Sequence, residues 1–229
     1  MSEPNEKRPS LLSVVIAGVM MAIIGAFVGI MFMATYPIQG FSNQEELDRY
    51  LEKEELPYIQ PGEVYYIEGP DRSGVSWQQV RKDILDGQKE VIDLPAGAFN
   101  TWLSANFQIG HPDQASASGI IVLPGMPKVS SLQTGEVFLS IPIEFKVYGA
   151  SYNRTYVAIG HFDQQGSPRF VVDEIQLDCA SIPVPVVGEL LHERLISIFS
   201  TTDEFQLLTS ALSQVSSVEV GDNSFRLRL

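Results

Sequence analysis

The longest apolar segment of the chain, Leu11 to Thr35, contains no acidic, basic, histidine or amide side chain. As a helix it would be about 37 Å long, against about 30 Å for the hydrocarbon core of a bilayer. It has no polar face, which disfavours a buried helix of a soluble protein. A cleaved signal peptide would be shorter and would end in small residues, which Phe32-Met33-Ala34 does not satisfy. We therefore predict a single-pass transmembrane helix, a signal anchor, over residues 11–36.

The charges that flank this segment predict its orientation. Lys7 and Arg8 precede it, and the next basic residue after it is Arg49. Basic residues stay on the cytoplasmic side of a membrane. We expect a cytoplasmic tail at residues 1–10, a span in the cytoplasmic (inner) membrane, and an outer, periplasmic or extracytoplasmic C-terminal part.

The residues after the span predict an acidic helix. Ser42 and Glu45 form a capping box, and apolar residues follow at helical spacing as far as Glu55, before Leu56-Pro57 ends the pattern. Six acidic and two basic side chains give this helix a strong negative charge. We predict a juxtamembrane helix or stalk over residues 37–60 that holds the following domain, residues 61–229, off the bilayer.

The domain alternates between strand and helix periodicities. The clearest strand begins at Glu136, where apolar residues at every second position from Val137 to Val147 would share one face, and Pro142 indicates an edge position or a bulge. This pattern predicts an α+β fold, with one twisted antiparallel sheet packed by amphipathic helices on one face. The predicted strands are 63–68, 90–94, 119–123, 136–149, 155–163, 169–179, 215–220 and 225–229, and the helices are 77–86, 95–107, 187–200 and 201–212.

Charge and cysteine content exclude some classes of function. The net charge is −13, and all of it lies outside the first ten residues, which hold two acidic and two basic side chains. Such a domain has no electrostatic footprint for nucleic acid, and its charge would not attract anionic lipid. Cys179 is the single cysteine, so no disulfide can form within the chain, and we expect it to be a small buried apolar residue.

A search for catalytic and metal-binding patterns finds none. The motifs of serine hydrolases, P-loops and dinucleotide sites are absent from the sequence. His192-Glu193 begins like a zinc motif, but Ile196 stands where the second histidine would be needed. His111, His161 and His192 lie far apart, and no carboxylate pair has the surroundings for acid–base chemistry. We expect no enzyme activity, no metal and no cofactor.

Three groups of residues are candidates for binding. Phe99, Trp102 and Leu103 form an apolar stripe on the helix at 95–107, which could be core or the wall of a ligand pocket. The segment Ile120–Leu123 is unusually apolar for its Ser-, Gly- and Pro-rich surroundings, and it would be a sheet edge or a contact for a ligand, a partner or the membrane. Gly25 and Gly29 form a G-x-x-x-G pair that could associate helices. The candidate ligand-binding side chains are Phe99, Trp102, Leu103, Ile120, Ile121 and Leu123.

The order of features after residue 90 resembles a bacterial family. A strand leads into the helix Leu94-Pro95-Ala96-Gly97-Ala98-Phe99-Asn100-Thr101-Trp102-Leu103, long strands follow, Pro183-Val184-Pro185 enters an amphipathic helix, and the strands Ser217–Val220 and Phe225–Leu229 close the chain. Over residues 90–229 this resembles the YpmS-like single-pass membrane proteins and, more loosely, lipid-binding tubular folds. The resemblance implies an anchored extracytoplasmic domain that handles lipid or another apolar ligand, and it supplies no catalytic residues.

Two functions remain open. The first is a noncatalytic, membrane-anchored domain that binds an apolar ligand such as lipid. The second is a scaffold or interaction subunit of an envelope membrane complex, which would assemble with itself or with other subunits through its span and its outer domain. An apolar cavity of a few hundred Å³ would favour the first function, and a filled core would favour the second.

Overall fold

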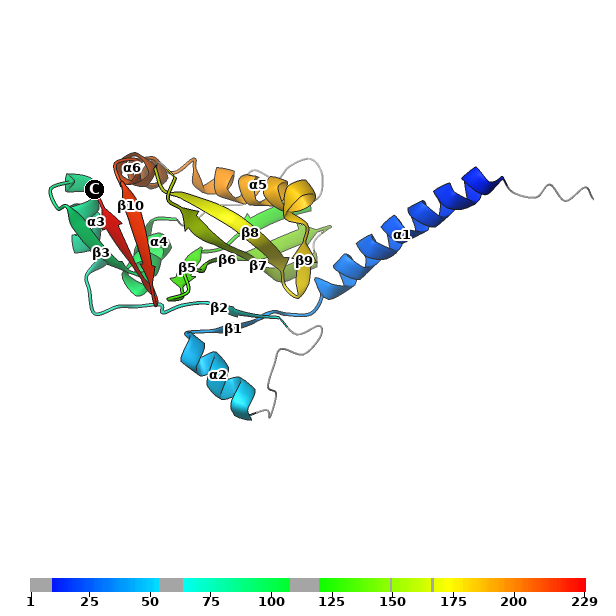
Figure 1. Cartoon of the computed structure of the whole chain (residues 1–229), viewed down its shortest axis with the longest axis horizontal. Helices are drawn as coiled ribbons and strands as arrows, with labels where there is room; N and C mark the ends of the chain where they lie inside the picture. The colour runs from blue at the N-terminus through cyan, green and yellow to red at the C-terminus, as the bar shows by residue number, and fades with distance from the viewer. Residues whose placement is uncertain (1–9, 54–63, 108–119, 149, 166) are drawn as a thin grey trace, which may run out of the picture.

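The computed structural model describes residues 10–53, 64–107, 120–148, 150–165 and 167–229. The predicted tail at 1–9, the end of the acidic segment and most of the Ser-, Gly- and Pro-rich segment fall outside these residues. The described chain is a mixed fold of helices and antiparallel sheets preceded by helix α1 (Leu11–Met33), which projects away from the rest (Figure 1). Within the described residues, α1 is the helix that is long and apolar enough to cross a membrane.

The largest sheet has six strands in the order β4-β6-β7-β8-β9, with β5 also paired to β6. All of its pairings are antiparallel, so the predicted meander of three long strands is confirmed as β6-β7-β8. The strands are β4 (Ile120–Pro124), β5 (Lys128–Ser131), β6 (Val137–Val147), β7 (Ala150–Asp163), β8 (Arg169–Leu177) and β9 (Ala180–Ile182).

Pro142 lies in a central strand, so of the two predicted alternatives, an edge position or a bulge, the edge position is wrong. On one side β6 pairs with β7, and on the other side it pairs first with β5 and then with β4. Pro142 is opposite the break between β4 and β5, where Gly125 donates its N–H to the Pro142 carbonyl over 2.6 Å. A strand interior tolerates proline at this point because the ladder is already interrupted.

The two faces of the six-stranded sheet are covered by different elements. On one face Ile141, Tyr156 and Ile175 belong to the main core, which helix α5 (Glu189–Phe199) helps to cover after the short π-helical turn η1 (Val184–Gly188). The opposite face packs Phe138 and Val157 against the parallel strands β1 (Gln39–Phe41) and β2 (Tyr65–Ile67). The helix α2 (Gln44–Lys53) contributes half-buried Leu47, Tyr50 and Leu51 to this second cluster.

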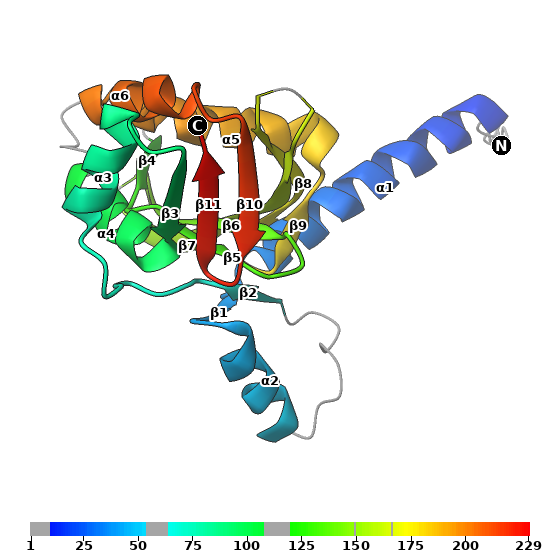
Figure 2. The ribbon, with the colours of Figure 1, turned by 60° about the vertical axis from the view of Figure 1, so that its left-hand side comes forward.

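A second antiparallel sheet stands at the end of the domain away from α1 (Figures 1 and 2). It contains β3 (Val91–Pro95), β10 (Ser217–Gly221) and β11 (Ser224–Arg228) in the order β10-β11-β3. The two antiparallel sheets are joined at a corner. There the Ser131 hydroxyl donates to the Gly221 carbonyl, and the Ser131 backbone carbonyl accepts the Asn223 N–H. The helices α3 (Trp77–Asp86), α4 (Ala96–Asn106) and α6 (Asp203–Leu212) complete the main core.

The sequence prediction of one sheet with helices on one face is therefore wrong. The described residues form three sheets, and α2 lies on the face opposite α5. Alternating patterns identify which side chains share a face, but they do not identify which strand a short strand will pair with. β3 joins the C-terminal hairpin because β11 offers it a free edge, in register from Val91 opposite Arg228 to Pro95 opposite Ser224.

Candidate apolar ligand site

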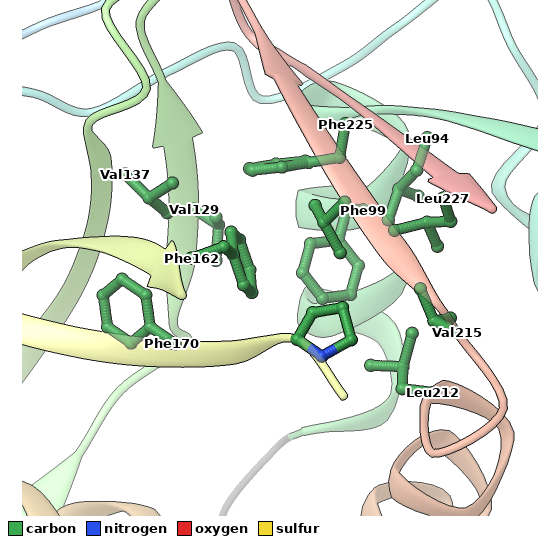
Figure 3. Close-up of a pocket in the computed structure, with 12 residues that line it drawn as sticks. Leu94, Phe99, Val129, Val137, Phe162, Phe170, Leu212, Val215, Phe225 and Leu227 are labelled. Atoms are coloured by element: carbon green, nitrogen blue, oxygen red, sulfur yellow. The ribbon is translucent and has the colours of Figure 1, made fainter. Parts of the chain in front are cut away.

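A cavity of about 200 Å³ lies between the two antiparallel sheets. The β7–β8 end of the large sheet, strands β3, β10 and β11, the first turns of α4 and the end of α6 surround it (Figure 3). Every side chain that lines the cavity is apolar. They are Leu94, Phe99, Val129, Val137, Phe162, Pro168, Phe170, Leu212, Val215, Val218, Phe225 and Leu227.

The C-terminal strand shows how the sequence builds one wall. Phe225 and Leu227 are buried and face the cavity, whereas Arg226 and Arg228 between them are exposed. Arg226 lies 2.8 Å from Asp93 on β3, so charges pair on the outer face of this small sheet. The period of two in the sequence thus separates an apolar inner face from a charged outer face.

A β-bulge shapes the opposite wall. Ile159 on β7 is opposite Glu174, but the next residue, Gly160, is opposite Val172, so Asp173 is an extra residue in β8. The extra residue lets Phe170 and Val172 pack in the main core on the same face as Ile175, although their spacing from Ile175 is odd. The bulge therefore turns Phe170 into the cavity.

The cavity limits what chemistry is available. Among the residues that the structure describes, the lining contains no hydroxyl, amide, thiol or charged side chain that could orient or activate a substrate. Its volume of about 200 Å³ is below the roughly 300–1,000 Å³ of most sites for drug-sized ligands and above the roughly 150 Å³ of a cavity that binds benzene. The arrangement can accept a short apolar group.

Of the predicted ligand-binding side chains, Phe99 lines this cavity and Trp102 does not. Phe99 packs edge-on against Trp102, with ring centroids 5.9 Å apart. The Trp102 indole is 1 % exposed and donates its N–H to Glu204 over 2.6 Å. Glu204 also accepts a hydrogen bond from Arg81 over 2.8 Å, and the guanidinium is the main cause that lowers the pKa of this carboxyl. Trp102 thus joins α3, α4 and α6 through a polar cluster.

The other predicted side chains lie elsewhere. Leu103 is buried in the main core without lining the cavity. Residues 120–124 form β4, an edge strand paired with β6, in which Ile121 and Leu123 are half-buried. Ile120 is opposite Val147 in this ladder. The structure does not bring these residues together with Phe99, and their role in binding stays a prediction.

Leu123 lines a second hollow beside the end of α1. This groove of about 650 Å³ runs from Thr35 and Pro37 to the strands β4, β6 and β7. The basic side chain of its described lining, Arg154, lies 3.4 Å from the carboxylate of Asp178, which is buried. Glu144, which also lines the groove, lies 3.8 Å from Lys146 outside it, so each charged side chain of the described lining already has a partner of opposite charge.

Gly25 and Gly29 lie on the exposed surface of α1. A Cβ built on either glycine would meet no atom within 4 Å. The helix thus presents open small-residue positions at which another helix could approach. Helix association stays a prediction.

Histidines and carboxylates do not form a metal centre in the part of the chain that is described, since no three such side chains converge there. His161 and Asp173 form a half-exposed surface pair over 2.6 Å. His111 lies outside the described residues. Among the described histidines, His192 of α5 is the one with a buried partner. Its Nδ1 is 2.7 Å from the hydroxyl of Tyr156 on β7.

The Tyr156–His192 contact predicts acid sensitivity. Burial lowers the pKa of His192, and Glu193 opposes this only in part. An unfolded chain would bind the proton near pH 6.5, above the pKa in the folded domain, so stability should be lost as pH falls from 7 through 6.5 toward 5. Thermal unfolding monitored by circular dichroism should show a falling melting temperature over this range. His192→Gln, which cannot take up the proton, should show a smaller slope; an equal slope would assign the acid sensitivity to other groups.

Comparison with known proteins leaves the chain without an identified family: no family model matches it, and no curated protein matches it.

Proposed function

We propose that the protein is a noncatalytic, membrane-anchored domain that binds a short apolar group, such as the end of an acyl chain, between its two antiparallel sheets. The observation that carries this proposal is the cavity itself, with about 200 Å³ and an entirely apolar lining. A cavity of this kind loses contacts that a filled core would make, and an apolar guest restores them.

Anchoring by α1 is supported by the way the helix joins the domain. Ala34, directly after the helix, is buried, and Ile30 and Met33 pack against the main core. A signal peptide would be removed together with these contacts, so they favour a helix that is retained. Lys7 and Arg8 support an N-terminus inside and a domain outside the cytoplasm.

The position of the cavity bears on how a ligand would reach it. Thr155 of β7 is bonded to the β8–β9 turn beside α1, and Phe162 of the same strand lines the cavity. They are seven positions apart on the strand, which corresponds to about 23 Å. The ligand would therefore be met outside the bilayer, as a free fatty acid or as the acyl group of a larger molecule.

Photolabelling tests this proposal. The full-length protein in phosphatidylcholine nanodiscs would be incubated with a palmitate analogue that carries a terminal diazirine, irradiated, and digested for mass spectrometry. We expect crosslinks on β8 and β11, at Phe170 and Phe225. Val218→Phe places a ring in the cavity and should reduce this labelling about tenfold or more, which corresponds to about 1.4 kcal/mol.

A matched substitution controls for non-specific labelling. Val171 belongs to β8, is 37 % exposed and alternates with the inward Phe170 and Val172, so Val171→Phe should leave labelling unchanged. If Val218→Phe folds and is labelled as strongly as the unmodified protein, the cavity is not the binding site.

A further inference from the structure

The chain that leaves α1 is fastened to the β8–β9 turn. Cys179 donates its N–H to the Tyr36 carbonyl over 3.1 Å, and its thiol lies 3.5 Å from the Pro37 carbonyl. The backbone of Ile38 also lies near the Asp178 carboxylate and favours its charged form, although burial raises the pKa of this carboxyl overall. Together with buried Ala34, these contacts hold the domain in one orientation relative to α1. If α1 crosses a bilayer, the same end of the domain must always face the lipid surface.

Besides Tyr36 of the α1 linker, which is 49 % exposed, and Val122 of β4, which is 39 % exposed, four large apolar or aromatic side chains are exposed at this end. Tyr148, between β6 and β7, is 90 % exposed, and Tyr152 on β7 is 49 % exposed. Val187 of η1 and Leu190 in the first turn of α5 are 53 % and 68 % exposed. We call these four residues the rim.

The strand pairing places the β6–β7 half of the rim next to α1. Thr155 donates its N–H to Asp178 over 2.9 Å, and Asp178 returns its N–H to the Thr155 carbonyl over 2.8 Å. β7 begins at Ala150, five residues before this contact, so the hairpin tip with Tyr148 and Tyr152 extends past the β8–β9 turn that holds the α1 linker. The tip is thus at the edge of the domain that adjoins α1.

The α5 half of the rim adjoins the same end. β9 contacts α1 and is followed, after Pro183, by η1 and α5. Figures 1 and 2 both show the first turn of α5 at the side of the domain from which α1 projects. Val187 and Leu190 therefore lie on the α1 side and not beside the three-stranded sheet.

The backbone at the tip follows from the turn. Val147 pairs with Ala150, so Tyr148 lies in a two-residue hairpin loop, and its φ of +47° is the left-handed conformation that such tight loops require. The turn holds the Tyr148 side chain away from the domain, where it is 90 % exposed.

We propose that the rim lies in the headgroup layer of the bilayer that α1 spans, with Tyr148 and Tyr152 as interfacial aromatic anchors and Val187 and Leu190 against the upper acyl region. Tyrosine rings prefer this layer because their apolar body and polar hydroxyl suit its two sides.

Charge at this end permits the contact with lipid. On the hairpin, Lys146 lies 3.8 Å from Glu144, and Arg154 lies 3.4 Å from Asp178. On the hairpin these two acidic side chains thus face basic ones, whereas on the α5 half of the rim the acidic Glu189 is exposed beside Leu190. Zwitterionic lipid would meet little net charge at the hairpin and one exposed carboxylate, Glu189, at the start of α5.

Fluorescence quenching by lipid tests this proposal, which rests on α1 as a membrane span but not on the cavity. The full-length variants Tyr148→Trp and Leu190→Trp would be reconstituted in vesicles of phosphatidylcholine with or without bromine in the acyl chains. After subtraction of the unmodified protein's own tryptophan emission, we expect about half of the added emission to be lost to brominated lipid. Leu207 lies on α6 at the far end of the domain and is 47 % exposed. The variant Leu207→Trp should therefore be quenched little.

Flotation and alkaline extraction of the same vesicles separate the two hypotheses. Protein that stays in the membrane while neither rim variant is quenched would overturn the lipid contact and leave the anchor intact. Blue-shifted emission without quenching would show that a protein surface covers the rim, which also overturns it. Protein released by alkaline extraction would overturn the anchor and the lipid contact together.

Discussion

Replacement of Asn100 by leucine should lower the melting temperature of the domain by about 10 °C, as expected for about 4 kcal/mol in a domain of this size. Asn100 is 3 % exposed, and its amide nitrogen donates to the carbonyls of Pro70 and Val129, each over 3.0 Å. Its amide oxygen accepts the Val129 N–H over 2.7 Å. Leucine has a similar size but would leave three backbone groups without partners.

The same substitution elsewhere on α4 provides the control. Among the described residues, Asn106 donates only to the Trp102 carbonyl of its own helix, over 3.0 Å. Asn106→Leu should therefore change the melting temperature by about 2 °C or less. Thermal unfolding of the full-length protein, followed by near-ultraviolet circular dichroism, compares the two. Equal melting temperatures would show that the Asn100 bonds add little to stability.

Asn100 also connects stability to the candidate site. Both backbone groups of Val129 that bond to Asn100 belong to a residue that lines the cavity. Phe99, the neighbour of Asn100 on α4, lines the same cavity. This turn of α4 thus shapes the apolar wall in two ways. Phe99 places its side chain in the cavity, and the Asn100 amide fixes the adjacent strand through Val129.

The sequence predicts those elements of the fold whose signals are local. The helix at 77–86 has the predicted bounds, and the meander follows from alternation along β6 and β7. The short strands β1, β5 and β9 are missed, because three or four residues are too few for a period to be visible. Their positions depend on edges that distant parts of the chain supply, such as the β2 edge that pairs with β1.

The candidate site was foreseen only in Phe99. A stripe of Phe99, Trp102 and Leu103 has the same spacing whether it faces a cavity, a core or a carboxylate. Trp102 bonds to Glu204 and not to the cavity, and Glu204 is 102 residues away in the sequence. A signal for the other wall is present in β8. Apolar residues stand at 170 and 172 and then at 175 and 177, and this change from even to odd positions indicates a bulge.

The bulge makes a strong demand on the residue opposite it. A Cβ on Gly160 would lie 2.0 Å from the Val171 carbonyl oxygen and 3.0 Å from the ring of Phe170. Gly160→Ala would push the β8 backbone away and should destabilise the domain by about 3 kcal/mol, with a fall in melting temperature of about 8 °C. Because Phe162 and Phe170 line the cavity, labelling by the diazirine fatty acid should fall as well.

A second change separates a local clash from a general intolerance of alanine. Deletion of Asp173 would regularise the β7–β8 ladder and still leave Phe170, Val172 and Ile175 on one face, so it should restore at least half of the lost melting temperature to Gly160→Ala. Gly74→Ala, where a Cβ meets no atom within 4 Å, should be neutral. A Gly160→Ala protein that melts like the Gly74→Ala control would contradict the close approach of the strands, and a double variant without recovery would mean that the bulge is not its cause.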